Sequence, residues 1–317
     1  MRLIMMGTGP FAVPTFRQLF DAWHDLALLV TQPLRSHRGK AVEPASAMRD
    51  IAREHATPIY DPEDINTSDA QQYLAGLGAD LLVVCDYGQI LAPKTLSTAR
   101  LGGINLHGSL LPKYRGAAPI NWALLNGDSE TGVTVIHMTA KVDAGPCVAQ
   151  AVTPIDAEET AVELEAQLAE SGGWLVRRTI DALAEGRLES LPQNAALASK
   201  APRLKKSDGA INWARPAVSI KNQIRALEPW PRTYTFWHRA GGAAVRMILG
   251  PVDIVDSPDS SSPPGAVLEA AGDRLVIAAG QGAIAPRTVQ LAGKRPMGIA
   301  ELLRGHKIKA GERFGPE

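Results

Sequence analysis

The chain of 317 residues has only two cysteines, Cys85 and Cys147, and neither stands in a Cys or His array of zinc-site spacing. A disulfide framework is not indicated either, which fits a reducing compartment. No apolar run approaches the roughly 20 residues that span a bilayer, and the first run, residues 3–6, is too short for a signal peptide. We therefore expect a cytoplasmic protein without a bound metal.

Net charge is also missing, because 33 Lys and Arg balance 33 Asp and Glu. This balance argues against a strongly basic nucleic-acid binder. It is uneven along the chain, however. Residues 1–199 carry 15 basic and 23 acidic side chains, a net of −8, and residues 200–317 carry 18 and 10, a net of +8. The basic second half either attracts a polyanion such as RNA or reflects chance variation on solvated surfaces, and charge alone does not decide between them.

Short apolar runs alternate with helical periodicity in the first half of the chain. Residues 81–84 are apolar throughout, as is typical of a strand buried on both faces of a parallel sheet. The alternation predicts an open α/β sheet. Strands are expected at 2–6, 26–30, from 59, 81–84, 103–107 and 131–138, and helices at 11–20, 48–55 and 159–184.

The second half has a different pattern. Residues 187–206 show little periodicity and contain two prolines, which indicates a linker. Short β-type runs with turn residues between them follow, and they predict a small β-barrel. The sequence therefore divides into a domain at 1–186, a linker at 187–206 and a domain at 207–317.

The glycine turn from Gly7 to Ala12 fits a loose dinucleotide-binding pattern after the first strand. A nucleotide would need an acidic residue at the end of the second strand to hold its ribose, and Thr31 to Pro33 stand there instead. Pro10 also lacks a backbone N–H that a phosphate would use. We favour a tight strand-to-helix turn over a nucleotide site.

The candidate chemistry lies around Asn105 and His107, which are separated by one residue and so share one face of a strand. Open α/β folds bind ligands at such carboxyl strand ends. An amide and an imidazole can donate hydrogen bonds to one developing oxyanion, and the imidazole can move a proton. Taken alone, the pair is more often a satisfied strand end. Asp143 either orients His107 or is a solvated turn residue.

The run from Asn105 to Pro119 resembles the signature of the folate-dependent formyltransferases. The resemblance is strongest to those members that act on a charged initiator tRNA. It continues along nearly the whole chain, at residues 6–8, 11–14, 31–33, 87–91, 143–145, 205–209, 211–213, 229–231 and 293–297.

The resemblance implies a Rossmann-like formyl-transfer domain followed by a smaller, OB-like barrel that binds tRNA. It implies 10-formyltetrahydrofolate as the formyl donor and the methionyl amine of the initiator tRNA as the acceptor, a step of translation initiation. No metal and no covalent enzyme intermediate are required. Nothing in the sequence demands more than a monomer.

The resemblance also implies roles for individual residues. Asn105 and His107 would polarise the formyl oxygen, and Asp143 would support His107 and help remove a proton from the attacking amine. The residues implied in folate binding are Ser109, Leu110, Leu111, Pro112, Tyr87 and Gly88. The residues implied in RNA binding are Arg35, Arg38, Lys40, Lys205 and Lys206.

The sequence departs from the family's pattern at three places, one of which is Pro146 and Cys147 after Gly145, where the family has an acidic residue. Leu34 follows Pro33 where the family has an acidic residue, and the basic loop at 34–40 is shortened. Asp86 stands where the family has a small apolar residue. If its carboxyl is buried, it needs a hydrogen-bond partner or an altered pKa.

Two other functions remain open at this point. A related formyltransferase that acts on a small amine would share the Asn105, His107 and Asp143 chemistry but would need no basic surface. A non-catalytic RNA-binding protein with an OB-like module would use exposed aromatics. Five aromatic residues do fall between Trp213 and Trp237, but barrel packing explains most of them.

Overall fold

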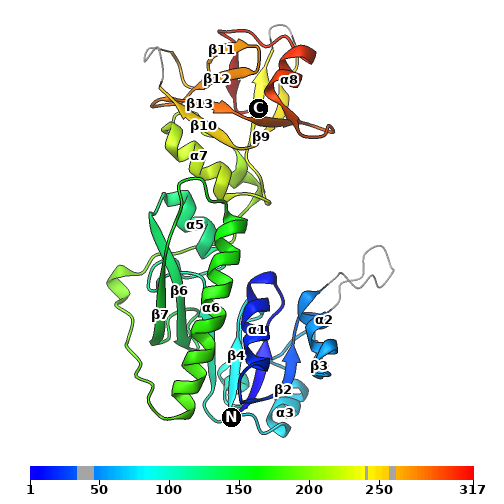
Figure 1. Ribbon diagram of the computed structural model, residues 1–317, viewed down its shortest axis with the longest axis vertical. Helices are drawn as coiled ribbons and strands as arrows, with labels where there is room; N and C mark the ends of the chain where they lie inside the picture. Colours follow the sequence, from blue (N-terminus) through cyan, green and yellow to red (C-terminus); the bar gives the residue numbers. More distant parts are fainter. Residues whose placement is uncertain (34–45, 240–241, 257–261) are drawn as a thin grey trace. The chain divides into compact units, whose positions relative to one another are not determined.

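The computed structural model describes residues 1–33, 46–239, 242–256 and 262–317 (Figure 1). They form two compact units. The first comprises residues 1–119, 130–155 and 163–202, and the second comprises residues 120–129, 156–162 and 203–317. Most of the predicted linker, 187–206, therefore groups with the first unit. Within these ranges no helix is both long and apolar enough to cross a membrane.

The first unit is built on a seven-stranded sheet with the order β3-β2-β1-β4-β5-β6-β7. The strands from β3 to β5 pair in parallel, while β6 and β7 are antiparallel to their neighbours. The strands are β1 (Arg2–Met6), β2 (Asp25–Val30), β3 (Ile59–Tyr60), β4 (Leu81–Val84), β5 (Gly103–His107), β6 (Glu130–His137) and β7 (Cys147–Pro154).

Helices cover both faces of this sheet. On one face, α6 approaches closely because it carries glycines: a Cβ at Gly172 would meet a methyl of Leu106 at 2.5 Å. On the other face, Leu74 of α3 and Leu96 of α4 join a core cluster with Val84 of β4. The α/β fold predicted from the sequence is confirmed. The helices are η1 (Pro10–Ala12), α1 (Val13–Phe20), α2 (Ala47–Glu54), α3 (Ser68–Gly76), α4 (Pro93–Leu96), α6 (Ala161–Ala184) and η2 (Ala195–Leu197).

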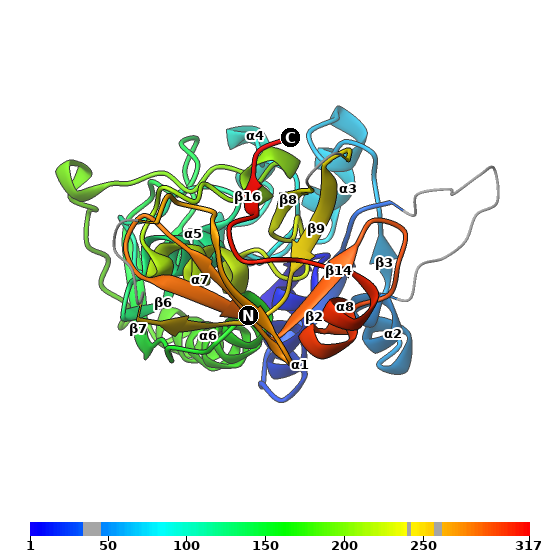
Figure 2. The same ribbon diagram turned by 90° about the horizontal axis from the view of Figure 1, so that it is seen from above.

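The second unit contains two antiparallel sheets, with the orders β10-β13-β12-β11 and β15-β14-β9-β8-β16. Figure 2 shows α8 beside β14. The elements are α5 (Pro119–Asn126), η3 (Lys206–Gly209), α7 (Ala217–Ala226), β8 (Tyr234–His238), β9 (Val245–Leu249), β10 (Val252–Val255), β11 (Val267–Ala271), β12 (Arg274–Ala278), β13 (Ala283–Pro286), β14 (Thr288–Leu291), β15 (Met297–Gly298), α8 (Ile299–Gly305) and β16 (Arg313–Gly315).

The two sheets join at their margins. Only two residues separate β9 from β10, and only Arg287 separates β13 from β14. At each of these points the backbone passes directly from one sheet into the other. A β-bridge between Ala266, which precedes β11, and Arg313 of β16 links an edge strand of one sheet to an edge strand of the other. The enclosed core includes Trp237 and Phe314, and Phe314 is fully buried. The predicted second unit of antiparallel strands is confirmed.

Candidate active site

The candidate residues lie where the central parallel strands end. Met6 of β1 pairs with Val84 of β4, and Val84 pairs with Asn105 of β5. The segments that follow these strands therefore emerge at the same edge of the sheet. As the spacing predicted, Asn105 and His107 both belong to β5, and His107 is its last residue.

Both nitrogens of the His107 ring face polar protein atoms. Nε2 lies 2.9 Å from the carbonyl oxygen of Tyr114, so the Nε2–H donates to that carbonyl. Nδ1 lies 3.7 Å from Oδ1 of Asp143, which is longer than a direct hydrogen bond. The other carboxylate oxygen, Oδ2, accepts from the backbone N–H of Gly116 at 2.9 Å. The structure thus brings His107 and Asp143 together and leaves Oδ1 turned toward the ring.

The two residues that face the His107 ring have unusual backbones. Tyr114 has φ +63° and Asp143 has φ +51°, a left-handed conformation that costs side chains other than glycine on the order of 1–3 kcal/mol. Such residues persist only where their surroundings hold them. The geometry around His107 is therefore imposed by the fold and not by the local sequence.

The Asn105 side chain is partly exposed. No hydrogen bond joins its amide to another side chain or backbone group in the described part of the chain. His107, in contrast, is 6% exposed. An amide with an open donor thus stands two residues before a nearly buried imidazole on the same strand.

Buried and partly buried hydrogen bonds fix the conformation of the loop after β5. The Ser109 hydroxyl donates to the carbonyl four residues on at 2.7 Å, and the Ser109 carbonyl accepts from Thr134 at 2.6 Å. The Thr134 hydroxyl also accepts from the N–H of Leu111 at 3.0 Å. Ser109 and Leu111 are buried, whereas Leu110 and Pro112 keep partly exposed apolar faces. Leu110 and Pro112 are the members of this group that present surface to a ligand.

Tyr87 holds neighbouring segments of the site together mainly through its backbone carbonyl. Its ring is 2% exposed and lies in the core cluster with Val84, and burial raises the pKa of its hydroxyl. Its carbonyl accepts from the Thr8 hydroxyl and from the Gln32 side-chain amide, both at 3.1 Å. Gly88, at φ +88°, is exposed beside it. These hydrogen bonds hold the glycine turn, the residues after β2 and the Tyr87 loop together at the same edge of the sheet.

Asp86, which departs from the family's pattern, lies against the glycine turn. Its φ is +47°, and a Cβ on Gly9 would stand 1.7 Å from its Oδ2. Desolvation by the surrounding protein, followed by the charge of Glu165, raises the pKa of Asp86 to about 6, although Asp86 is an exposed residue. A side chain at the second glycine of the turn would therefore displace the Asp86 carboxylate.

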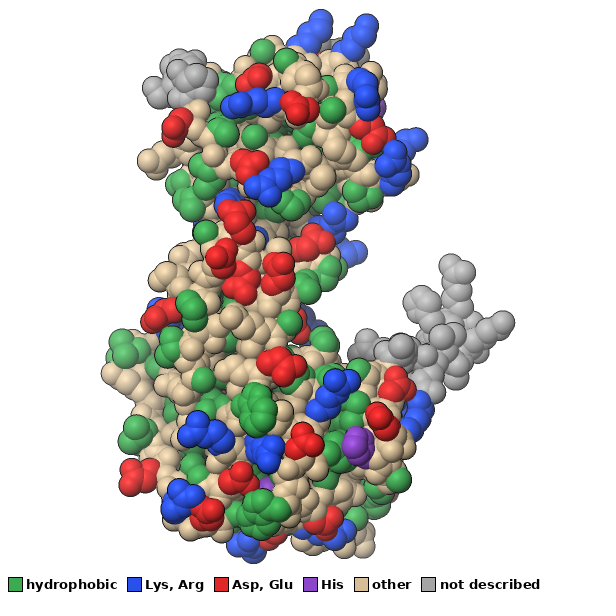
Figure 3. Space-filling view, viewed as in Figure 1, with side chains coloured by type: hydrophobic (Ala, Val, Ile, Leu, Met, Phe, Trp, Pro, Cys, Tyr) green, Lys and Arg blue, Asp and Glu red, His purple; other side chains and the backbone are tan. Residues whose placement is uncertain are grey.

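The residues predicted to bind RNA fall into two groups. Arg35, Arg38 and Lys40 lie outside the described residues. Lys205 and Lys206 are exposed at the start of η3 in the second unit. Lys and Arg side chains project from the surface of that unit (Figure 3).

Sequence reasoning gave Tyr114 no role of its own, although its carbonyl holds the His107 ring. A backbone carbonyl has no side-chain signature, so only the structure reveals this contact. In the described ranges no group of three or more His, Cys, Asp or Glu side chains is arranged to hold a metal ion.

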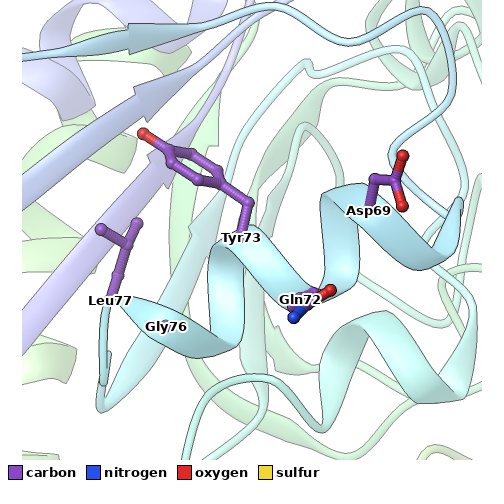
Figure 4. Close-up of a pocket in the computed structure, with 5 residues that line it drawn as sticks. All are labelled: Asp69, Gln72, Tyr73, Gly76 and Leu77. Atoms are coloured by element: carbon purple, nitrogen blue, oxygen red, sulfur yellow. The ribbon is translucent and has the colours of Figure 1, made fainter.

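A shallow hollow lies over α3, lined by Asp69, Gln72, Tyr73, Gly76 and Leu77 (Figure 4). All five residues come from one helix and its end, and none belongs to the candidate site. The hollow has no buried charged group that would give it chemistry, and we assign it no role.

Comparisons with known proteins identify the family of the chain. The formyl transferase family model matches residues 1–180, and the formyl transferase C-terminal domain model matches residues 203–307. The methionyl-tRNA formyltransferase of Rhodopirellula baltica is 42% identical, with 99% of this chain and 96% of the relative covered. That of Akkermansia muciniphila is 41% identical, with 96% and 97% covered.

Solved structures show the same fold at low identity. An N-formyltransferase from Helicobacter canadensis, solved with folinic acid and dTDP-3-aminofucose, superposes with a TM-score of 0.67 at 18% identity, covering 90% of this chain and 97% of the other. Glycinamide ribonucleotide transformylase 1 from Symbiobacterium toebii gives 0.51 at 21% identity, covering 61% and 93%.

Proposed function

Because the chain belongs to the family of methionyl-tRNA formyltransferases, we propose that it transfers the formyl group of 10-formyltetrahydrofolate to the amino group of a methionyl initiator tRNA. The transfer passes through a tetrahedral oxyanion without a covalent bond to the enzyme. The placement of His107 between the Tyr114 carbonyl and Asp143 is the observation that carries the chemistry.

The first step is attack of the neutral amine nitrogen on the formyl carbon, which moves an electron pair onto the formyl oxygen. Asn105 and His107 are the donors for this oxyanion. Since Nε2–H is held by a carbonyl, Nδ1 is the ring nitrogen that remains for the substrate. To donate to the oxyanion, Nδ1 must carry a proton, and the Asp143 carboxylate lies 3.7 Å from it. Preorganised donors of this kind are worth about 10²–10³ in rate each.

Collapse of the intermediate requires two proton movements. The attacking nitrogen loses a proton, and Asp143 Oδ1 is placed to accept it because only Oδ2 is tied to Gly116. The C–N bond to the folate breaks, and the folate nitrogen takes up a proton as it leaves. Oδ1 and Nδ1 are 3.7 Å apart and share no direct hydrogen bond, so each keeps its capacity to bond with a reacting group.

The apolar surface beside the site suits a flat donor. Leu110 and Pro112 are partly exposed. Ile90, just beyond Gly88, is 69% exposed, and Val142, next to Asp143, is 54% exposed. Exposed apolar side chains adjoining a polar catalytic group fit a ligand with an aromatic ring and a reactive nitrogen. We propose that these residues contact the folate and that Ser109 and Tyr87 support them from behind.

Lysines of the second unit provide positive charge that can bind the acceptor tRNA. Lys205 and Lys206 of this unit are exposed, and the chain from residue 200 onward carries a net +8. Cations of this kind bind RNA phosphates without reading sequence. We propose that Lys205 and Lys206, together with Arg35, Arg38 and Lys40, contact the tRNA. A charged tRNA as substrate places the reaction in the cytoplasm.

A formylation assay with different acceptors tests the proposal. The purified protein is given 10-formyltetrahydrofolate with either methionyl initiator tRNA or a nucleotide-linked amino sugar. Product on the tRNA alone supports the proposal. Product on the sugar alone would assign the site to a small amine and leave the basic second unit without its proposed use.

A further inference from the structure

The segment at 191–201, predicted as part of a linker, is hydrogen-bonded at both ends to the candidate site. At its start, Leu191 and Cys147 exchange backbone hydrogen bonds, each of 2.8 Å. At its end, Ala201 donates to the carbonyl of Arg115 at 2.8 Å. Cys147 follows the Asp143 loop and Arg115 follows Tyr114. The segment, which we call the brace (residues 191–201), therefore spans the two loops that face His107.

Gln193 uses its whole side-chain amide between these loops. Its Nε2 donates to the carbonyl of Asp143 at 2.9 Å and to that of Gly145 at 2.7 Å. Its Oε1 accepts from Nε and from a terminal nitrogen of Arg115, at 3.0 Å and 2.6 Å. Both N–H donors and the carbonyl acceptor of the amide are engaged. One side chain thus connects the Asp143 loop to the residue after Tyr114.

Ser199 makes the matching contact on the other loop. Its hydroxyl accepts from the N–H of Tyr114 at 2.9 Å, and its carbonyl accepts from the N–H of Arg115 at 2.9 Å. Within residues 191–200, all of them described, Gln193 and Ser199 are the two that are not exposed. Apart from Ala201 at its end, which is buried, the brace therefore turns only these two side chains inward, each toward a loop that faces His107.

The backbone strain explains why such contacts are needed. Tyr114 and Asp143 both hold left-handed conformations, which relax unless neighbouring groups fix them. The bonds from Ser199 and Gln193 act on these two residues directly. Without them, the Tyr114 carbonyl and the Asp143 carboxylate would drift from the ring nitrogens that they face.

We propose that the brace positions the catalytic histidine, with Gln193 and Ser199 as positioning residues that hold Asp143 and Tyr114 against His107. The inference rests on the proposed function, since it assumes that His107 and Asp143 act in the transfer. Neither residue of the brace touches substrate in this account. Their effect is transmitted through the backbone of the two loops.

Steady-state formylation by Gln193 variants tests this role. Gln193→Ala removes all four hydrogen bonds, and a displacement of about 1 Å at a catalytic group costs up to 10²-fold, so we expect kcat to fall roughly 10- to 100-fold. The KM values for folate and tRNA stay within about twofold, since the variant leaves the binding residues in place. Gln193→Glu keeps the contact with Arg115 but loses both N–H donors, and we expect its kcat to fall at least as far as that of Gln193→Ala.

Asn194→Ala is the matched control. Asn194 is next to Gln193, and among the described residues its side chain accepts only from the N–H of Ala196, within the brace itself, so turnover should stay within about twofold of the wild type. Circular dichroism and a melting curve for each variant check that the fold is intact. A merely structural role for Gln193 would lower the melting temperature and raise KM along with the fall in kcat, and that result would overturn the proposal.

A double-mutant cycle separates this proposal from the proposed function. If Gln193 acts through Asp143, adding Gln193→Ala to Asp143→Ala lowers kcat no further, because the two changes are not additive. Full additivity would contradict the inference, as would wild-type kcat in Gln193→Ala when Asp143→Ala is inactive. Wild-type kcat in Asp143→Ala itself would instead refute the proposed role of Asp143 and the inference together.

Discussion

Replacing Gly145 with alanine tests whether close packing places Asp143. A Cβ at Gly145 would stand 1.7 Å from the carbonyl oxygen of His137, and an ordinary contact begins at 3.4 Å. One side must therefore move by about 1.7 Å. His137 ends β6, which is hydrogen-bonded to β5 and β7 on its two sides, so the Asp143 loop moves. Since misplacement by about 1 Å can cost 10²-fold, we expect kcat to fall on the order of 10²-fold.

The assay is the initial rate of formyl transfer at saturating folate and charged tRNA, with a melting curve of the same sample. Gly76→Ala is the control, because nothing lies within 4 Å of its Cβ position and its φ is not left-handed. An alanine near this helix end should leave kcat unchanged and stabilise the fold by up to about 0.5–1 kcal/mol. If Gly145→Ala keeps kcat within about twofold of the wild type, the loop is not held as we argue.

Two further predictions concern stability. The folded pKa of Asp86, about 6, lies above its ordinary value of 3.8, so its charged form destabilises the fold above pH 6 and the penalty disappears as the pH falls toward 3.8. Asp86→Asn should therefore raise the melting temperature at pH 8 but not at pH 4, and equal gains at both would contradict this. Phe314 is fully buried near the end of the chain. Phe314→Ala should destabilise the second unit by about 3–5 kcal/mol in denaturant unfolding, and an unchanged midpoint would count against its place in the barrel core.

Much of the fold could be predicted where the sequence pattern is local. The apolar run at 81–84 gave β4 without error, because a strand buried on both faces leaves no polar positions. The strand β7 (Cys147–Pro154) was missed, since its small and polar residues do not alternate cleanly. The helix predicted from residue 159 begins at Ala161. The Glu159 side chain accepts from the N–H of Asp156, before the helix begins.

The candidate site was also predictable only where the sequence pattern is local. The shared face of Asn105 and His107 follows from strand periodicity alone. The approach of Asp143 does not, because it depends on how the loop after β6 folds back toward β5. Gln193 lies in a stretch whose prolines and weak periodicity indicated a linker. That composition reports the absence of regular elements, but it says nothing about side-chain hydrogen bonds to distant loops.

The most direct test of the account compares the wild-type protein with His107→Ala in one measurement, the rate at which labelled formyl moves from 10-formyltetrahydrofolate to methionyl initiator tRNA. The wild type should transfer the label. The variant should retain its fold and lose turnover by about 10²–10³, as expected when an oxyanion donor is removed. Transfer by the variant at near the wild-type rate would contradict the central claim that His107 carries the chemistry.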